Sequence, residues 1–309
     1  MIPHLRLGTR GSALALAQAD LTTTALSGLC DLHREIIVTT GDRRTDIPLA
    51  EVAAASGVVD KGVFIKELEL ALLDDRIDFA VHSLKDVPTI LEPEFEICAT
   101  LPRAPIGDVL ITTGPSFSEL PSGATIGTSS ERRRYQLLDL RPDLKIIDIR
   151  GNVPTRLSQV AESSSYDGII LAEAGLLRLG YPVGGTLPHE SHSLHSELFP
   201  AQNFLPAAGQ GAVALEIRKD NSKARELLSQ ISHSPTFNAI TAERHFLALL
   251  QAGCDTPVGV LSSYQETTLH LNARVYEQDG QVLEASSSHS DPLIAAQQLF
   301  DNLSTRSHA

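Results

Sequence analysis

Strand-like and helix-like segments alternate through most of this 309-residue sequence, and this alternation constrains the fold more than any other feature. The apolar run LRLGT (5–9) precedes SALALAQADLTTTAL (12–26), whose small and apolar residues suit a helix packed on a sheet. A helix-like segment over 63–75 is followed by IDFAVHS (77–83), which predicts a buried strand. The same order returns between residues 124 and 180. Repetition of strand, loop and helix predicts a largely parallel sheet with helices on its faces.

Two tracts rich in turn-forming residues, and a change in the order of elements after about residue 230, predict domain boundaries. Residues 102–108 (PRAPIGD) are rich in turn formers, and residues 181–206 form a Pro-, Gly-, His- and Ser-rich tract that predicts a long loop. After about residue 230 a helix-like segment precedes two strand-like runs and a closing helix. We therefore expect two α/β domains and a smaller C-terminal α+β domain. Their predicted bounds are 1–103 with 207–228, 104–206 and 229–309.

The composition limits the classes of function. Hydrophobic residues make up 42% of the chain, and the formal net charge of −13 argues against generic nucleic-acid or membrane-surface binding. Three widely spaced cysteines, Cys30, Cys98 and Cys254, form no disulfide framework and suit a reducing cytosol. The first residues lack the features of a signal peptide, and no run approaches the roughly 18 apolar residues of a membrane helix. We expect a soluble, cytoplasmic protein.

Basic residues gather where the predicted strands end. Ligands of open α/β sheets bind at the carboxyl ends of the strands, so we expect these residues to line one cleft between the two α/β domains. Arg132 and Arg133 follow a predicted helix start, where free backbone N–H groups favour an anion. Residues 220–309 hold five Lys and Arg against ten Asp and Glu, so positive charge is concentrated in the α/β part. Solvated surface charge is the alternative, but the grouping favours a large anionic ligand. The candidates are Arg10, Lys61, Lys85, Arg132, Arg133, Arg150, Arg156 and Arg178.

Asp86 and Cys254 are two further candidates for a role in catalysis. Asp86 follows Lys85 in the loop directly after the predicted strand 77–83, where a carboxylate can stabilise a developing cation or transfer a proton. A turn-forming aspartate is an equal alternative. Cys254 lies on a small-residue turn in LLQAGCDTPVG (249–259), so it is either an incidental loop thiol or a reactive one.

Three motif-like features do not support a function. GQGAVA (209–214) fits a dinucleotide fingerprint but precedes a strand-like run instead of opening a helix. His189, His192 and His195 have three-residue spacing in the predicted loop, and HESH (189–192) falls one residue short of the HExxH zinc motif, so we expect no metal. No GxxxxGK[ST] phosphate-binding loop is present.

Seven motifs occur in a characteristic order over nearly the whole chain: LRLGTRGSALALAQA, FIKELELALL, DFAVHSLKDVPT, IGTSSERRRYQLL, RGNVPTRLS, LPAAGQGAV and TAERHFLALLQAGCDTPVG. Together they resemble the porphobilinogen deaminases (hydroxymethylbilane synthases), transferases of tetrapyrrole and heme biosynthesis. The resemblance implies two periplasmic-binding-protein-like (type II) α/β domains and a smaller α+β domain. It also implies a dipyrromethane cofactor, joined by a thioether to Cys254.

The implied reaction joins four porphobilinogen molecules head to tail into linear hydroxymethylbilane and releases ammonia. Each pyrrole carries an acetate and a propionate, which agrees with the large anionic ligand inferred from the arginines. The resemblance further implies a monomer whose partner is the small-molecule substrate, with no nucleic acid or membrane.

The resemblance also assigns roles to single residues. Asp86 matches the catalytic aspartate, assisted by Lys85. Cofactor binding is expected for Cys254, Arg132, Arg133, Arg156, Ser130 and Lys61. Substrate binding is expected for Arg10, Ser12, Arg150, Arg178 and Gln210.

Two departures from the family pattern stand out. The segment 50–62 is several residues longer than the usual glycine-rich loop, which puts the ligand contact of Lys61 in doubt. Leu177 replaces a frequent lysine. Two alternatives remain open at this stage: a small-anion binding protein, and a thiol-dependent hydrolase or transferase in which His245 would serve Cys254 as a base.

Overall fold

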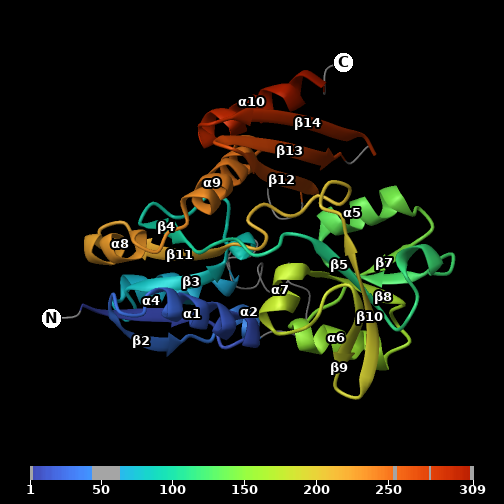
Figure 1. Cartoon of the computed structure of the whole chain (residues 1–309), viewed down its shortest axis with the longest axis horizontal. Helices are drawn as coiled ribbons and strands as arrows, with labels where there is room; N and C mark the ends of the chain where they lie inside the picture. Colours follow the sequence, from blue (N-terminus) through green and yellow to red (C-terminus); the bar gives the residue numbers. More distant parts are fainter. Residues whose placement is uncertain (1–2, 44–62, 253–255, 278–279, 307–309) are drawn as a thin grey trace. The chain divides into compact units, whose positions relative to one another are not determined.

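The computed structural model describes residues 3–43, 63–252, 256–277 and 280–306. They form two compact units, Met1–Ala104 with Gly211–Arg244 and Pro105–Gln210 with His245–Ala309. Each of the two units contains a mixed α/β sheet, and a separate three-stranded sheet with a helix follows near the C-terminus (Figure 1). The predicted fold class of two α/β domains and a smaller α+β domain is confirmed. The predicted three-domain boundaries stay a prediction.

The sheet of the first unit has the strand order β2-β1-β3-β11-β4. Its strands are β1 (His4–Thr9), β2 (Asp31–Ile36), β3 (Phe79–Ser83), β4 (Phe95–Thr100) and β11 (Val213–Arg218). Strand β1 is parallel to β2 and β3, whereas β11 is antiparallel to β3 and β4. Strand β2 is followed by the short helix α2 (Thr40–Arg43). The other α-helices among the described residues of this unit are α1 (Ala13–Ala25), α4 (Lys66–Leu73), α8 (Ser222–Ser229) and the part of α9 (Ser234–Leu249) up to Arg244.

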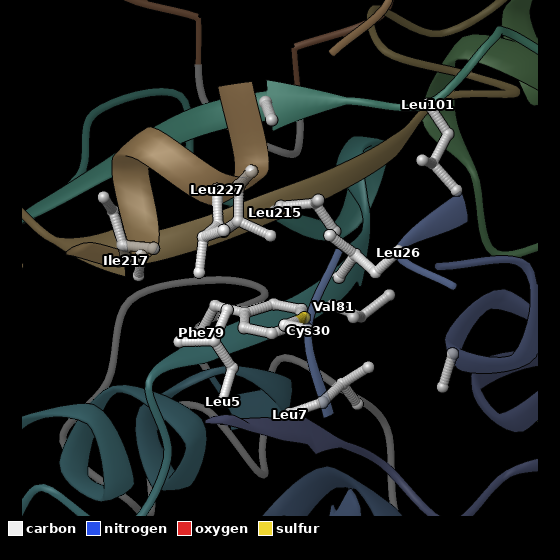
Figure 2. Close-up of a cluster of buried hydrophobic side chains, with 14 of the residues drawn as sticks. Leu5, Leu7, Leu26, Cys30, Phe79, Val81, Leu101, Leu215, Ile217 and Leu227 are labelled. Carbon is white, nitrogen blue, oxygen red and sulfur yellow. The ribbon is translucent and has the colours of Figure 1, made fainter. Parts of the chain in front are cut away.

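One buried cluster of the first unit lies on one face of its sheet (Figure 2). Alternate residues of a strand point to the same face, so Leu5 and Leu7 of β1 lie beside Phe79 and Val81 of β3 in one buried cluster. Cys30 belongs to this cluster, and burial raises the pKa of its thiol. It is therefore a packing residue.

The sheet of the second unit has the order β7-β6-β8-β5-β10-β9. Its strands are β5 (Asp108–Thr112), β6 (Thr125–Gly127), β7 (Lys145–Ile147), β8 (Gly168–Ala172), β9 (Gly185–His189) and β10 (His192–Phe199). Only β7, β6 and β8 run parallel, because β5, β10 and β9 each pair antiparallel. The largely parallel sheet expected from the sequence is thus wrong for this unit. Its helices are α5 (Glu131–Leu140), α6 (Val153–Glu162) and α7 (Glu173–Arg178).

The predicted loop over residues 181–206 is also wrong, since β9 and β10 form a hairpin there. Leu187 and Leu194 pair across it and are both buried. His189 is buried too: its Nε2 lies 2.9 Å from Ser158 Oγ, and its Nδ1 lies 3.2 Å from the Tyr181 hydroxyl. The alternation of apolar and polar residues indicates strands here, but the Gly, Pro and Ser content obscures it.

The C-terminal part is an antiparallel meander of β12 (Val258–Gln265), β13 (Thr268–Tyr276) and β14 (Val282–His289), followed by α10 (Pro292–Arg306). The sequence predicted β13, β14 and α10 but not β12. Tyr276 of β13 packs on Tyr135 of α5, with ring centroids 5.6 Å apart. This sheet therefore contacts the helix that carries Arg132 and Arg133.

Candidate active site

Asp86 lies at the end of the 3-10 turn Leu84–Asp86, which directly follows the central strand β3. Leu84 is buried, and its backbone N–H donates to the Ala212 oxygen at 3.1 Å, so the turn is tied to the chain entering β11. Lys85 and Asp86 remain half-buried. The predicted catalytic carboxylate thus sits at the carboxyl end of a strand, where ligands of α/β sheets bind.

Arg10 lies at the same edge of the sheet, because it directly follows β1, the parallel neighbour of β3. Its Nε lies 3.1 Å from Asp42 Oδ2, and its guanidinium stacks 4.2 Å from the centroid of the Phe64 ring. Burial alone would raise the pKa of Asp42, but the hydrogen bonds from Arg10 and from the Thr39 hydroxyl lower it below its usual range. Ser12, two residues after Arg10 in the chain, caps α1 by accepting from the Ala15 N–H at 3.3 Å.

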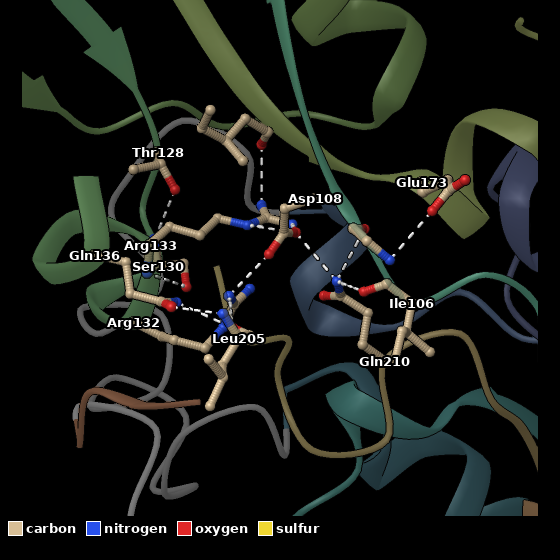
Figure 3. Close-up of polar contacts among 12 residues, drawn as sticks. Ile106, Asp108, Thr128, Ser130, Arg132, Arg133, Gln136, Glu173, Leu205 and Gln210 are labelled. Carbon is tan, nitrogen blue, oxygen red and sulfur yellow. Dashed lines mark hydrogen bonds and ion pairs between the residues drawn. The ribbon is translucent and has the colours of Figure 1, made fainter. Parts of the chain in front are cut away.

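The second unit brings three predicted binding residues together around one carboxylate that the sequence did not single out, that of Asp108 (Figure 3). Arg133 donates to Asp108 Oδ1 from Nε at 3.0 Å and from Nη2 at 2.6 Å. Nη1 of Arg132 lies 2.8 Å from Oδ2 of the same residue. Gln210 donates to Asp108 Oδ1 at 3.1 Å and to the Ile106 oxygen at 2.7 Å. Asp108, both arginines and Gln210 are all buried.

Helix α5 presents the two arginines. Ser130 is its N-cap, and its hydroxyl accepts from the Arg133 N–H at 3.5 Å. Arg132 also donates to the Leu205 oxygen at 2.6 Å, yet its buried Nε has no hydrogen-bond partner among the residues that the structure describes. Burial lowers the pKa of Arg132, although the charge of Asp108 raises it. A desolvated cation with an unused N–H is suited to a carboxylate of a ligand.

The remaining predicted arginines lie near the ends of other elements of this unit. Arg150 follows β7, and Arg156 on α6 donates from Nε to the Gly151 oxygen at 2.9 Å. Arg178 is the last residue of α7, and burial lowers its pKa to about 10, so it stays protonated at neutral pH. These positions leave the binding roles of all three as predictions.

Two predicted residues, Cys254 and Lys61, lie outside the described residues. Within the described ranges no group of three or more His, Cys, Asp or Glu side chains could hold a metal ion. No helix in that part of the chain is long and apolar enough to cross a membrane.

Asp108 is a residue of the candidate site that the sequence analysis did not identify. The only signal was an acidic residue opening the otherwise apolar run DVLIT. A lone acid before a buried strand more often faces solvent, and nothing in the sequence shows that two arginines and an amide converge on it.

Fold and site define a class: an α/β protein with an arginine at the end of a strand of one sheet and two buried arginines at the start of a helix beside the other. Comparison with protein-family models identifies the family within this class. The description "Porphobilinogen deaminase, dipyromethane cofactor binding domain" matches residues 5–226, and "Porphobilinogen deaminase, C-terminal domain" matches residues 237–301. The chain belongs to the porphobilinogen deaminase family, transferases of tetrapyrrole biosynthesis that carry a dipyrromethane cofactor.

Curated relatives agree with this assignment. The porphobilinogen deaminase of Syntrophobacter fumaroxidans is 41% identical over 295 residues, covering 94% of this chain and 90% of that protein. The one from Syntrophomonas wolfei is 44% identical over 293 residues, with the same two coverages.

Two more distant relatives by fold are known from solved structures. A probable amino-acid ABC transporter extracellular-binding protein of Bacillus subtilis shares 9% identity over 78% of this chain and 97% of its own, with a TM-score of 0.41. Lipoprotein Tp32 of Treponema pallidum shares 12% identity over 81% of this chain and 96% of its own, with a TM-score of 0.39.

Proposed function

We propose that this chain condenses four porphobilinogens into hydroxymethylbilane with Asp86 as the catalytic carboxylate and Cys254 as the attachment point of its cofactor. The observation that carries the binding half of this proposal is the buried Arg132 guanidinium, whose Nε has no partner among the described residues. The other half rests on Asp86, which the family resemblance selects and which lies at the end of the central strand β3.

Asp86 would stabilise the positive charge that develops on the substrate during the reaction. Loss of ammonia breaks the C–N bond of the substrate's aminomethyl group and leaves positive charge spread over the pyrrole. A fixed carboxylate close to that ring stabilises the charge, and it can move a proton to or from the reacting pyrrole. Lys85, the preceding residue, would assist by holding a substrate carboxylate.

The donor set fits the side chains of a dipyrromethane, whose acetates and propionates are carboxylates. Arg132, Arg133 and Arg156 would bind them, with Ser130 and Lys61 assisting, because guanidinium forks bind carboxylates through two hydrogen bonds. Arg10, Arg150 and Arg178 would bind the substrate in the same way, and Ser12 and Gln210 would each donate a hydrogen bond to it. When bound, the dipyrromethane supplies the pyrrole to which the first substrate unit is joined.

The first experiment is the intact mass of the purified chain, with peptide mapping around Cys254. We expect an excess mass equal to two linked pyrroles, localised to that cysteine and giving a pyrrole colour reaction. The variant Cys254→Ser is the matched control and should lack the excess mass. If the unmodified wild type gains no mass after porphobilinogen is added, the attachment proposal is wrong and an anion-binding protein becomes the better interpretation.

We further propose that the chain acts as a monomer in the cytoplasm, with porphobilinogen and no nucleic acid as its partner. The net charge of −13 supports the absence of a nucleic-acid partner, since nucleic acids repel an acidic protein. Cys30 is buried and Cys98 half-buried, both with free thiols, as suits a reducing compartment. Light scattering at several concentrations tests the oligomeric state.

A further inference from the structure

The backbone that follows Asp86 is bound by one arginine from a distant part of the chain. Residues 87–89 form neither helix nor strand. Nη2 of Arg244, on α9, donates to the Pro88 oxygen at 2.7 Å and to the Thr89 oxygen at 2.9 Å. Nη1 lies 3.5 Å from the Val87 oxygen. Three consecutive carbonyls therefore face a single guanidinium.

This arrangement suits arginine better than lysine. Carbonyls that leave water need a donor, and consecutive carbonyls of an irregular segment have none from a regular ladder. The guanidinium supplies several N–H donors in a fixed planar fork, whereas lysine is a point charge on a flexible stem. Burial lowers the pKa of Arg244, while the charge of Glu216 raises it. The Arg244 guanidinium is thus buried against residues 87–89 although its desolvation costs free energy.

The same helix fixes the segment through apolar contacts. Ile240, one turn before Arg244 on α9, belongs to a buried cluster with Leu84 and Val87, the residues that flank Lys85 and Asp86. Helix α9 is itself held in place, because Glu243 accepts from Arg103 Nη1 at 2.6 Å and from Nη2 at 3.0 Å. The turn that carries Asp86 is therefore packed on a helix that has its own anchor.

We propose that Arg244 is a positioning residue for Asp86. Val87 follows Asp86 directly, so a movement of the 87–89 backbone changes the direction of the Asp86 carboxylate. Arg244 restrains that backbone from the C-terminal side, and the bond from the Leu84 N–H to the Ala212 oxygen restrains it from the N-terminal side. This inference rests on the proposed catalytic role of Asp86.

Two variants of the holoenzyme test the proposal. Arg244→Gln removes the fork, and we expect about a tenfold loss of kcat with KM and cofactor mass unchanged, because a misplaced catalytic group slows the chemical step. Arg244→Lys keeps the charge without the fork, so it should fold as the wild type does and recover only part of kcat. The pH profile of kcat should shift in both variants, since the surroundings of Asp86 change.

The control is Arg218→Gln. Arg218 also donates to two backbone carbonyls, those of Leu72 and Leu73, at 3.3 and 3.5 Å. It lies at the far end of β11 from Val213, which pairs with Ser83 beside the Asp86 turn. We expect Arg218→Gln to lower the melting temperature and leave kcat and its pH profile unchanged.

The outcomes separate the two proposals. If Arg244→Gln and Arg244→Lys change only the melting temperature, as the control does, while Asp86→Asn abolishes turnover, Arg244 is a structural residue and this inference is wrong. Should Arg244→Gln fail to fold, unchanged kcat and pH profile in Arg244→Lys would overturn it as well. Near-normal turnover in Asp86→Asn would remove the proposed function itself.

Discussion

The carboxylate of Asp108 accepts two hydrogen bonds from Arg133, from Nε at 3.0 Å and from Nη2 at 2.6 Å. Its other oxygen lies 2.8 Å from Nη1 of Arg132. Within the part of the chain that the structure describes, one buried carboxylate thus faces two buried guanidinium groups, so positive charge exceeds negative charge among these three side chains. Such an excess is stabilised by a further carboxylate, and the ligand proposed for this site supplies several.

The first prediction concerns this cluster. Asp108→Asn leaves two buried arginines without their counter-charge, so we expect the free energy of unfolding to fall by about 3–5 kcal/mol. Urea denaturation of the variant measures the change. Asp20→Asn is the control, because Asp20 pairs with Arg34 at the surface, where ion pairs contribute little. Equal losses in the two variants would show that the Asp108 cluster carries no special stability.

The second prediction concerns catalysis. Asp86→Asn keeps the side-chain shape but removes the negative charge, so we expect at least about a hundredfold loss of kcat in a folded protein that retains its cofactor mass. Asp75→Asn removes an exposed carboxylate of the same unit and should retain normal turnover. Turnover and intact mass are measured on the same preparations, and normal kcat in Asp86→Asn would exclude the charge mechanism.

A third prediction tests the contact of the C-terminal sheet with the arginine cluster. A Cβ atom added to Gly259 of β12 would lie 2.6 Å from Leu205 Cβ and 3.1 Å from the Leu205 oxygen, which accepts from Arg132. Gly259→Ala should therefore destabilise the protein by about 1–3 kcal/mol, as overpacking does. Gly114→Ala meets no atom within 4 Å and serves as the control in thermal denaturation. A neutral Gly259→Ala would mean that the sheet moves away from Leu205 without cost.

The fourth prediction is a pH dependence of stability. Burial, together with the charge of Glu216, raises the pKa of Glu69 to about 7 from an unperturbed 4.5. Between these two values the folded protein holds a proton that the unfolded chain releases, so the free energy of unfolding falls as the pH rises through this window. Glu69 is only partly buried, and solvent screening reduces the effect to the order of 1 kcal/mol.

Glu69→Gln keeps the neutral shape at every pH and should remove this dependence. The measurement is the difference in unfolding free energy between the wild type and Glu69→Gln at about pH 5 and about pH 8. We expect the variant to gain on the wild type at the higher pH. A difference that stays constant would show that Glu69 titrates alike in the folded and unfolded chain.

Much of the local structure could be predicted, and α5 shows why. The helix start predicted just before Arg132 and Arg133 is observed at Glu131, since ERRRYQLLDL contains strong helix formers and Ser130 precedes it as a cap. The hairpin of β9 and β10 was missed because its Gly, Pro and Ser residues are typical of loops. Burial of Leu187 and Leu194 against the rest of the sheet overrides that local preference.

The sequence by itself determined the alternation of elements, the family and the identity of the candidate residues, because these depend on local periodicity and on motifs of fixed spacing. Only the tertiary structure decided that Asp108 lies between Arg132 and Arg133, and that Arg244 binds the carbonyls after Asp86. Arg244 is 157 positions from Val87, and no local preference links residues so far apart. Such contacts arise when buried polar groups must find partners after the strands and helices have packed.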